Sequence, residues 1–436
     1  KAAIQAGCDA VYLAYIDFSA RKSAANFDLD ALTQACDYAH LHLVKVYVTI
    51  NTIIYQEEFK KLKLFLDELI KIKVDGLIVQ DLGVIKYIKV HYQTFHIHSS
   101  TQMNIRTKDG YALLKKLGVE RIVLGRELSL DDVKELSTYG NSIGVETEIF
   151  IHGAICFSCS GNCYFSEYIG SRSGNRGECA QICRKDFELY EVGKKEDVLL
   201  NENQKNILSM KDLMTLENIN EIIESGVSSL KIEGRMRDAN YVRATVASYR
   251  TLVDAYYDGI LTQEMKDIVT NDLLVNFNRG GAFTTQYLNG HKPENFLSGS
   301  YVGKFGLRIG GIASTDSKKG TIVIRLKDGV TEPSRGDYVS IRDKNEEICS
   351  FPIGKIHEAP GSITVKGLHP DQISKLHSGM SVYLMNHDFL GNDYPDRKTV
   401  INISIDTSDS STITANAVVT GGMLDQCFAE ETIDLD

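Results

Sequence analysis

Five of the nine cysteines in the chain lie in one segment, at Cys156, Cys159, Cys163, Cys179 and Cys183. An alternating apolar run at 145–151 leads into them and predicts a β-strand. The Gly, Ser and Asn residues behind that strand favour a loop over a packed helix. A strand that delivers cysteines onto a glycine-rich loop is typical of a metal site, because thiolates bind both zinc and iron.

Two metal chemistries and a disulfide framework compete for these cysteines. A structural zinc site favours two short paired spacings, whereas only Cys179 and Cys183 form a close pair and Cys156 and Cys163 stand farther apart. Iron–sulfur clusters need four thiolates and accept more varied spacings. A disulfide scaffold is less consistent with a chain of 436 residues that has no secretory signal pattern. The spacing favours a metal over inert buried cysteines and leaves iron–sulfur and zinc open.

The elements that must position these residues alternate between strands and helices. Strands are predicted at 10–14, 44–50, 76–79, 95–98, 121–124, 145–151 and 229–232. Helices are predicted at 29–40, 57–72, 83–91, 108–117, 130–138, 213–225 and 240–257. Such alternation implies right-handed βαβ units and a parallel sheet. A closed TIM-type barrel is the favoured arrangement, and a doubly wound open sheet is the alternative.

In a barrel, the residues that directly follow the strands share one rim, where barrel enzymes place their chemistry. The polar residues at these positions that we select as candidates are Arg21, Asn51, Gln102, Arg126, His152, Glu233 and Arg235. His152 is either a packed histidine or a proton donor and acceptor beside the cysteines. Glu233 and Arg235 form either a structural ion pair or a pair that orients a substrate.

Arginines on the rim suit a small dicarboxylate, although surface arginines are often simply solvated. Asn51 and Gln102 are weaker candidates, because both side chains could serve only to satisfy loop backbone groups. The net charge of −10 is not typical of a nucleic-acid-binding protein. The cysteine segment is more basic than the rest of the chain, since it carries Arg172, Arg176, Arg184 and Lys185. Only the local field matters at a site.

Three runs of sequence carry a family resemblance: EIFIHGAICFSCSGNC at 148–163, NRGECAQICR at 175–184 and LKIEGRM at 230–236. They are similar to the collagenase-like peptidase family (unassigned class U, family thirty-two), and the similarity extends through nearly the whole chain. The family begins with one more strand, which would lie before Lys1 and would complete a (β/α)8 barrel.

The resemblance implies an activity that the family name does not describe. The better-understood branches resemble oxygen-independent hydroxylases that modify a pyrimidine of transfer RNA or large-subunit ribosomal RNA, using prephenate; others act in ubiquinone synthesis. They carry a 4Fe–4S cluster, and matching the motif assigns its ligands to Cys156, Cys163, Cys179 and Cys183. Cys159 is then a spare thiol. An aerobic preparation can carry zinc or no metal instead.

The pattern of the chain changes near residue 276, which indicates further domains. We expect the barrel at 1–290 with an inserted cysteine-rich loop at 152–190, and a small all-β barrel module at 291–398. Residues 399–436 are expected to begin a further, truncated domain. Helix periodicity fades after the barrel, and short strands separated by Gly, Pro and Asp turns take its place.

The sequence leads to one favoured function and two alternatives. We expect iron–sulfur-dependent hydroxylation of a pyrimidine in structured RNA, ribosomal rather than transfer RNA, with prephenate as co-substrate and Arg176 beside the RNA. No apolar run is long enough to cross a bilayer, so cytoplasm is expected, without a membrane or DNA partner. The first alternative is a collagenase-like peptidase, for which the sequence contains neither a nucleophile elbow nor HExxH, although Cys156 follows His152 by four residues. The second is a non-catalytic RNA-binding or assembly factor.

Overall fold

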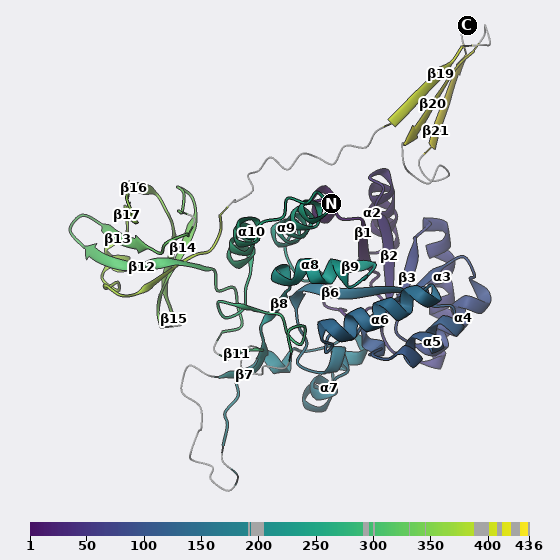
Figure 1. The fold of residues 1–436 in the computed structure, drawn as a ribbon, viewed down its shortest axis with the longest axis horizontal. Helices are drawn as coiled ribbons and strands as arrows, with labels where there is room; N and C mark the ends of the chain where they lie inside the picture. Colours follow the sequence, from purple (N-terminus) through teal and green to yellow (C-terminus); the bar gives the residue numbers. More distant parts are fainter. Residues whose placement is uncertain are drawn as a thin grey trace.

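The computed structural model describes residues 1–190, 192, 205–290, 296–299, 301–330, 332–344, 346–387, 401–407, 412–419 and 428–434. Within them the chain is a mixed α/β protein with one large, mainly parallel sheet and further antiparallel sheets (Figure 1). None of the described helices is long and apolar enough to cross a membrane.

The large sheet carries the N-terminal two thirds of the chain. Its parallel strands pair in chain order and are β1 (Ala10–Ala14), β2 (Lys45–Ile50), β3 (Gly76–Val79), β4 (His96–Ser99), β5 (Arg121–Val123), β6 (Glu146–Ala154) and β9 (Ser229–Ile232). At its far end β8 (Asp212–Met214) runs antiparallel to β6, and β10 (Phe283–Thr284) pairs with β8. A doubly wound sheet reverses its strand order at a switch point, and the described strands show no such reversal.

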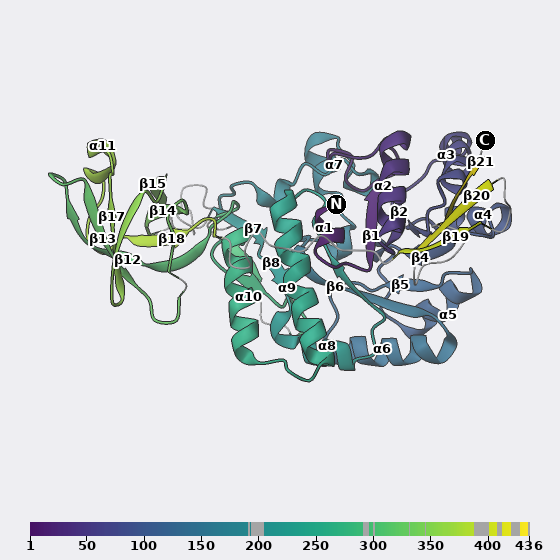
Figure 2. The same ribbon diagram turned by 90° about the horizontal axis from the view of Figure 1, so that it is seen from above.

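Helices follow the parallel strands and cover the sheet (Figures 1 and 2). They are α1 (Ala2–Gln5), α2 (Leu29–Leu41), α3 (Phe59–Ile72), α4 (Leu82–His91), α5 (Lys108–Lys116), α6 (Leu130–Ile143), α8 (Ile219–Glu224), α9 (Ala239–Tyr257) and α10 (Gln263–Asn276). Side chains of Asp28, Asp81, Thr107 and Ser129 accept hydrogen bonds from free backbone N–H groups at helix starts. These caps fix where each helix begins and so define the loop before it.

The core lies between the strands and the inner faces of the helices. Strand β3 is buried along its whole length, and α3 contributes Leu62, Leu66 and Leu69, which are all 0% exposed. Strands buried on both faces read as continuous apolar runs, which is why their positions were predictable from sequence.

One predicted helix, at 213–225, is wrong at its start. Residues Asp212–Met214 form β8, and the helix begins only at Ile219. The reason is tertiary: β8 pairs with the end of β6, and Asp212 forms ion pairs with Arg237 and Arg279. Local periodicity cannot register such long-range pairing.

The β-rich part of the chain forms a separate antiparallel sheet with its own apolar core. Its described strands, in spatial order, are β15 (Glu346–Pro352), β14 (Tyr338–Asp343), β18 (Ser381–Leu384), β12 (Leu307–Asp316), β13 (Thr321–Leu326), β17 (Ser362–Lys366) and β16 (Lys355–Ala359). Short helix α11 (Pro370–Ile373) packs its Ile373 into this core.

A further small sheet follows, made of β19 (Ile401–Asp406), β20 (Thr412–Val419) and β21 (Phe428–Asp434). The expected domain boundaries near 290 and 398 adjoin or fall within 291–295 and 388–400, which lie outside the described residues.

A buried charge network ties three strands of the large sheet together. The carboxylate of Glu148 on β6 accepts hydrogen bonds from Lys231 Nζ at 2.6 Å and Ser229 Oγ at 2.7 Å, both on β9, and from Arg121 Nη1 on β5 at 3.5 Å. Burial raises the pKa of Glu148, but Lys231 and the other neighbouring cations lower it more, to about 2. Because the ordinary value is 4.5, this stabilisation is fully present above pH 4.5 and is lost as the pH falls toward 2.

Replacing Lys231 by Met should lower the free energy of unfolding by about 3–5 kcal/mol, because it leaves the Glu148 carboxylate buried without its main partner. Denaturant unfolding at pH 7, followed by circular dichroism, measures this loss. Lys63→Met is the matched control, since the Lys63–Asp67 pair is exposed and solvent screening should make its loss far less costly. The double variant Lys231→Met/Glu148→Gln should recover most of the stability, and a double variant no better than the single would contradict this account.

Candidate functional site

The cysteine loop begins where β6 ends at Ala154 and contains helix α7 (Phe165–Gly170) and short 3₁₀ turns at Cys159–Gly161, Gly174–Arg176 and Ile182–Arg184. Gly177 has a φ of +83°, and a Cβ there would lie 2.1 Å from the carbonyl oxygen of Ser19. Only glycine permits this contact. The loop is thereby held against the segment that carries Arg21.

Three of the four cysteines that the family motif selects act electrostatically on the fourth, Cys183. Burial raises the pKa of Cys183, Arg184 lowers it, and Cys156, Cys179 and Cys163 raise it further. These three thiols therefore lie within electrostatic range of Cys183, whereas Cys159 is exposed. All of the described cysteines are free thiols.

Backbone N–H groups point at two of the sulfur atoms. The amide of Phe165 donates to Cys163 Sγ at 3.3 Å, and the amide of Gln181 donates to Cys179 Sγ at 3.4 Å. Hydrogen bonds of this kind stabilise thiolates and tune the potential of iron–sulfur clusters.

The described thiols do not form a site for a single metal ion. Among the described residues, no group of three or more His, Cys, Asp or Glu side chains is close enough together to hold one metal ion. A zinc ion needs its ligands within about 2.0–2.3 Å of a single point. A cluster is a larger body with one thiolate at each iron, so its ligands stand farther apart. The thiol donors themselves are of the type that an iron–sulfur cluster takes.

Beside the cysteines, one carboxylate is surrounded by guanidinium groups. Glu233 follows β9, and its Oε2 accepts a hydrogen bond from Tyr12 OH at 3.1 Å. Burial raises the pKa of Glu233, but Arg21, Arg126 and Arg235 together lower it below the ordinary value. Glu233 is thus ionised at neutral pH. Three cations face a single anion, so the local charge stays positive.

Arg126 is held by the protein in a way that leaves one N–H donor without a partner among the described residues. Arg126 Nη1 donates to the carbonyl of Ala154 at 2.7 Å. The guanidinium of Arg126 stacks 3.8 Å from the centroid of the Phe150 ring. Its Nε is enclosed and has no hydrogen-bond partner among the described residues. Burial lowers the pKa of Arg126, and the nearby Glu233 and Cys156 oppose that shift. Arg126 therefore links the carboxylate site to the cysteines.

The neighbouring rim residues support this arrangement. Arg235 Nη2 donates to Ser19 Oγ and Asn26 Oδ1, both at 2.8 Å. Asn51 Oδ1 accepts from the backbone N–H of Ala20 at 3.0 Å, so Asn51 holds the loop of Arg21 in place. The structure thus brings Arg21, Arg126, Glu233 and Arg235 together, with Asn51 behind them.

Three other candidates lie outside this group. His152 is 1% exposed, packs among the rings of Tyr241, Tyr249 and Phe283, and burial lowers its pKa to about 3. It is therefore a neutral, enclosed histidine. The carbonyl of Gln102 accepts from Asn162 Nδ2 at 3.0 Å, which puts Gln102 next to the cysteine loop.

Arg176 is committed to a structural pair. Its two terminal nitrogens donate to Glu58 at 2.9 and 2.7 Å, and Nη1 also donates to the carbonyl of Ile53 at 2.7 Å. The guanidinium lies 4.3 Å from the Tyr55 ring centroid. Arg176 thus fastens the cysteine loop to the segment after β2.

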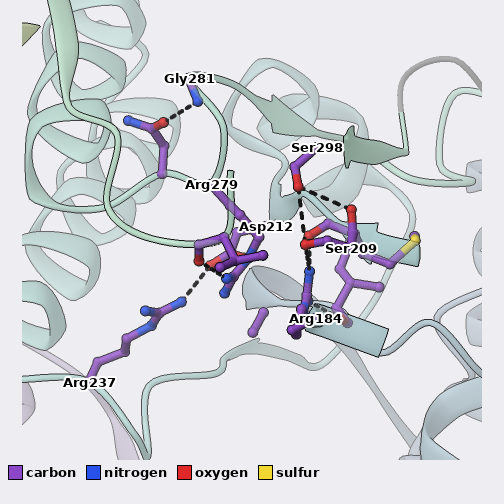
Figure 3. Close-up of polar contacts among 12 residues, drawn as sticks. Arg184, Ser209, Asp212, Arg237, Arg279, Gly281 and Ser298 are labelled. Atoms are coloured by element: carbon purple, nitrogen blue, oxygen red, sulfur yellow. Dashed lines mark hydrogen bonds and ion pairs between the residues drawn. The ribbon is translucent and has the colours of Figure 1, made fainter. Parts of the chain in front are cut away.

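A second arginine group, missed by sequence reasoning, surrounds Asp212. Asp212 is 0% exposed and accepts hydrogen bonds from Arg237 Nη2 at 2.7 Å and Arg279 Nε at 3.0 Å, with Arg184 nearby (Figure 3). The sequence did not indicate a role for Asp212, because this residue falls at the edge of a predicted helix. Arg237 and Arg279 were detectable only as arginines beside the motifs IEGR and NRGG. Tyr12 was also missed, because it reads as part of an apolar strand.

Comparison with known proteins places this geometry in a family. Residues 1–297 match the family described as Peptidase family U32. The chain is 33% identical over 359 residues to the 23S rRNA 5-hydroxycytidine C2501 synthase of Escherichia coli strain K12, covering 80% of the chain and 51% of that protein. It is 35% identical over 258 residues to tRNA hydroxylation protein P1 of Bacillus subtilis strain 168, covering 59% of the chain and 60% of that protein.

A third relative has a different name. The chain is 31% identical over 367 residues to a protein named collagenase from Porphyromonas gingivalis strain W83, covering 80% of the chain and 86% of that protein. The chain spans about half the length of the E. coli relative. On the match over residues 1–297 and the identity to these relatives, the chain belongs to peptidase family U32.

Proposed function

We propose that the protein is an iron–sulfur-dependent, oxygen-independent hydroxylase of a pyrimidine base in structured RNA, with prephenate as co-substrate. The observation that carries this proposal is the arginine group around Glu233, which reaches the cysteines through Arg126. Relatives named for hydroxylation of ribosomal and transfer RNA support the reaction class. Ribosomal RNA is favoured, because the match to the ribosomal relative covers 80% of the chain and that to the transfer-RNA relative 59%. An RNA substrate of this kind implies action in the cytoplasm.

In this proposal the cluster would be held by Cys156, Cys163, Cys179 and Cys183. A bound cluster would supply one-electron redox chemistry. The remaining roles belong to side chains of this chain. Arg21, Arg126 and Arg235 bind the carboxylates of the co-substrate. Three guanidinium groups and the single carboxylate of Glu233 leave two positive charges, which a dianion would neutralise.

Glu233 and Tyr12 act together beside the bound co-substrate. Glu233 is ionised because the surrounding arginines lower its pKa, and the same shift makes it a hydrogen-bond acceptor for the co-substrate and a weak base. Burial and the adjacent carboxylate raise the pKa of Tyr12 well above its usual value, so Tyr12 keeps its proton and orients Glu233 by a hydrogen bond. His152 is neutral and enclosed, and we assign it a packing role beneath the site.

We also propose that the large sheet closes into a TIM-type barrel. Strands β1 and β9 do not pair with each other in the described residues, and a cavity of about 970 Å³ lies between them, lined by Tyr12 and Leu13 of β1 and by Lys231 of β9. One further parallel strand between these edges would complete the ring of eight.

The relative named collagenase makes peptide hydrolysis the second candidate. A cysteine peptidase needs a base within hydrogen-bond reach of its thiol. Cys156 Sγ contacts Ser158 Oγ at 3.4 Å, whereas both ring nitrogens of His152 are buried without a hydrogen-bond partner among the described residues. This geometry favours the hydroxylase.

Anaerobically prepared protein should be brown and contain about four irons per chain, as a thiolate-held cubane requires. Serine in place of Cys156, Cys163, Cys179 or Cys183 should bleach the protein or make the iron labile, whereas Cys159→Ser, the matched control, should leave iron content unchanged. Iron analysis and visible absorption measure both effects. Stoichiometric zinc under strict anaerobiosis would exclude the cluster.

Replacing Arg126 by Gln should weaken prephenate binding by about 1.5–3 kcal/mol for each charged hydrogen bond lost. Isothermal titration calorimetry gives this difference directly. Arg308→Gln, an exposed arginine on β12, should bind prephenate as the wild type does. A variant at Arg126 that loses iron or unfolds, without a specific loss of binding, would identify the residue as structural.

Mass spectrometry of RNA nucleosides tests the activity itself. Deleting the gene should remove one hydroxylated pyrimidine, and the wild-type gene should restore it while Cys179→Ser should not, because the reaction needs the cluster. The target base should be unpaired or looped out, since a stacked base cannot reach a buried site. If all nucleosides stay unchanged while metal-free protein cleaves gelatin, the peptidase function is correct.

A further inference from the structure

Arg184 lies where the two ends of the cysteine loop meet. Its Nη2 donates a hydrogen bond to the carbonyl oxygen of Ile155 at 2.8 Å, and its Nη1 donates to Ser209 Oγ at 2.8 Å and to the carbonyl oxygen of Met210. Ile155 directly precedes Cys156, and Arg184 directly follows Cys183. One guanidinium group therefore joins the backbone beside the first cysteine ligand to the backbone beside the last.

The base on which Arg184 rests is buried and tightly bonded. Ser209 and Met210 belong to β7 (Asn206–Met210) and are 0% and 5% exposed. Strand β11 (Leu297–Gly299) pairs with β7, and Ser298 Oγ lies 3.1 Å from Ser209 Oγ (Figure 3). Because the guanidinium of Arg184 bonds to a paired strand, it fixes the position of the cysteine loop more closely than a contact between two loops would.

Among the residues that the structure describes, no carboxylate accepts a hydrogen bond from Arg184. The nearby Asp212 is already shared by Arg237 and Arg279, which donate to its two oxygens. The thiols of Cys183 and Cys156 also act electrostatically on Arg184. When these thiols are ionised as ligands, Arg184 is a nearby cation.

We infer that Arg184 is a positioning residue of the cysteine site, which holds Cys156 and Cys183 next to each other and offsets the negative charge of their thiolates. The first part stands on the three hydrogen bonds alone. The second part rests on the proposed iron–sulfur function. Arg184 does not itself contact the substrate in this role.

Thiol cross-linking of the full-length, metal-free protein tests the first part. A short bifunctional thiol reagent is added, and mass spectrometry quantifies the peptide pair that joins Cys156 to Cys183. Arg184→Gln should lower this yield about tenfold, because losing one charged hydrogen bond shifts a closed–open equilibrium by about that factor. Arg184→Lys should fall between, since an ammonium group keeps the charge but not the planar fork. Lys185→Gln changes the exposed neighbouring residue and should cross-link like the wild type.

The reduction potential of iron-loaded protein tests the second part. Arg184→Gln should lower the potential, because a nearby cation favours the more negative, reduced cluster, and Arg184→Lys should restore it. Wild-type cross-linking together with a wild-type potential in Arg184→Gln would overturn the inference, even if the melting temperature fell. If Arg184→Gln does not fold, Arg184→Lys gives the cross-linking comparison at smaller amplitude. Cross-linking requires neither RNA nor metal, so failure of the hydroxylase proposal would be seen separately, as unchanged RNA in cells that lack the gene.

Discussion

The two ion pairs of the buried Asp212 carboxylate hold β8 to the segments that carry Arg237 and Arg279. Asp212 lies on β8, accepts hydrogen bonds from Arg237 after β9 and from Arg279 near the start of the β-rich part, and is 0% exposed. Arg279 also donates to the carbonyl of Val302, and Asn278 Nδ2 donates to the carbonyl of Gly306 at 3.0 Å. Removing one partner of such a group leaves a buried charge uncompensated, which costs about 3–5 kcal/mol. The large sheet and the segment that leads into the antiparallel sheet thus meet at the two ion pairs of Asp212.

The distribution of charge resolves an apparent contradiction between composition and chemistry. The chain carries a net charge of −10, yet two groups of arginines lie around Glu233 and around Asp212. In the proposed function the four thiolates would concentrate negative charge, and fixed cations nearby would stabilise it without the reorganisation that solvent would require. The overall acidity therefore says little about the site, because the field at short range is set by its closest charges.

Sequence reasoning succeeded where the determinants are local and failed where they are not. The strands and helices from β1 to β6 were predicted because their apolar runs and caps are contiguous, and the family was recognised from the cysteine and IEGR motifs. The β8 strand and the role of Asp212 could not be predicted, since both depend on pairing with residues far along the chain. The rim arginines were named from their positions after strands, but the enclosure of His152 by Tyr241, Tyr249 and Phe283 requires the packed structure. Likewise, only the structure reveals that Arg176 forms an ion pair with Glu58.

The close approach of Gly177 to Ser19 joins the cysteine loop to the loop of Arg21. The backbone N–H of Lys22 donates to the carbonyl of Gly177 at 3.0 Å, so the cysteine loop and the loop of Arg21 share backbone contacts on both sides. Neither loop can shift without moving the other. In the proposed function, occupancy of the arginine site and of the thiols would then be coupled equilibria, and thermodynamic reciprocity requires each to change the affinity of the other by the same factor. Retention of the proposed cofactor would thereby depend on the small anion bound next to it.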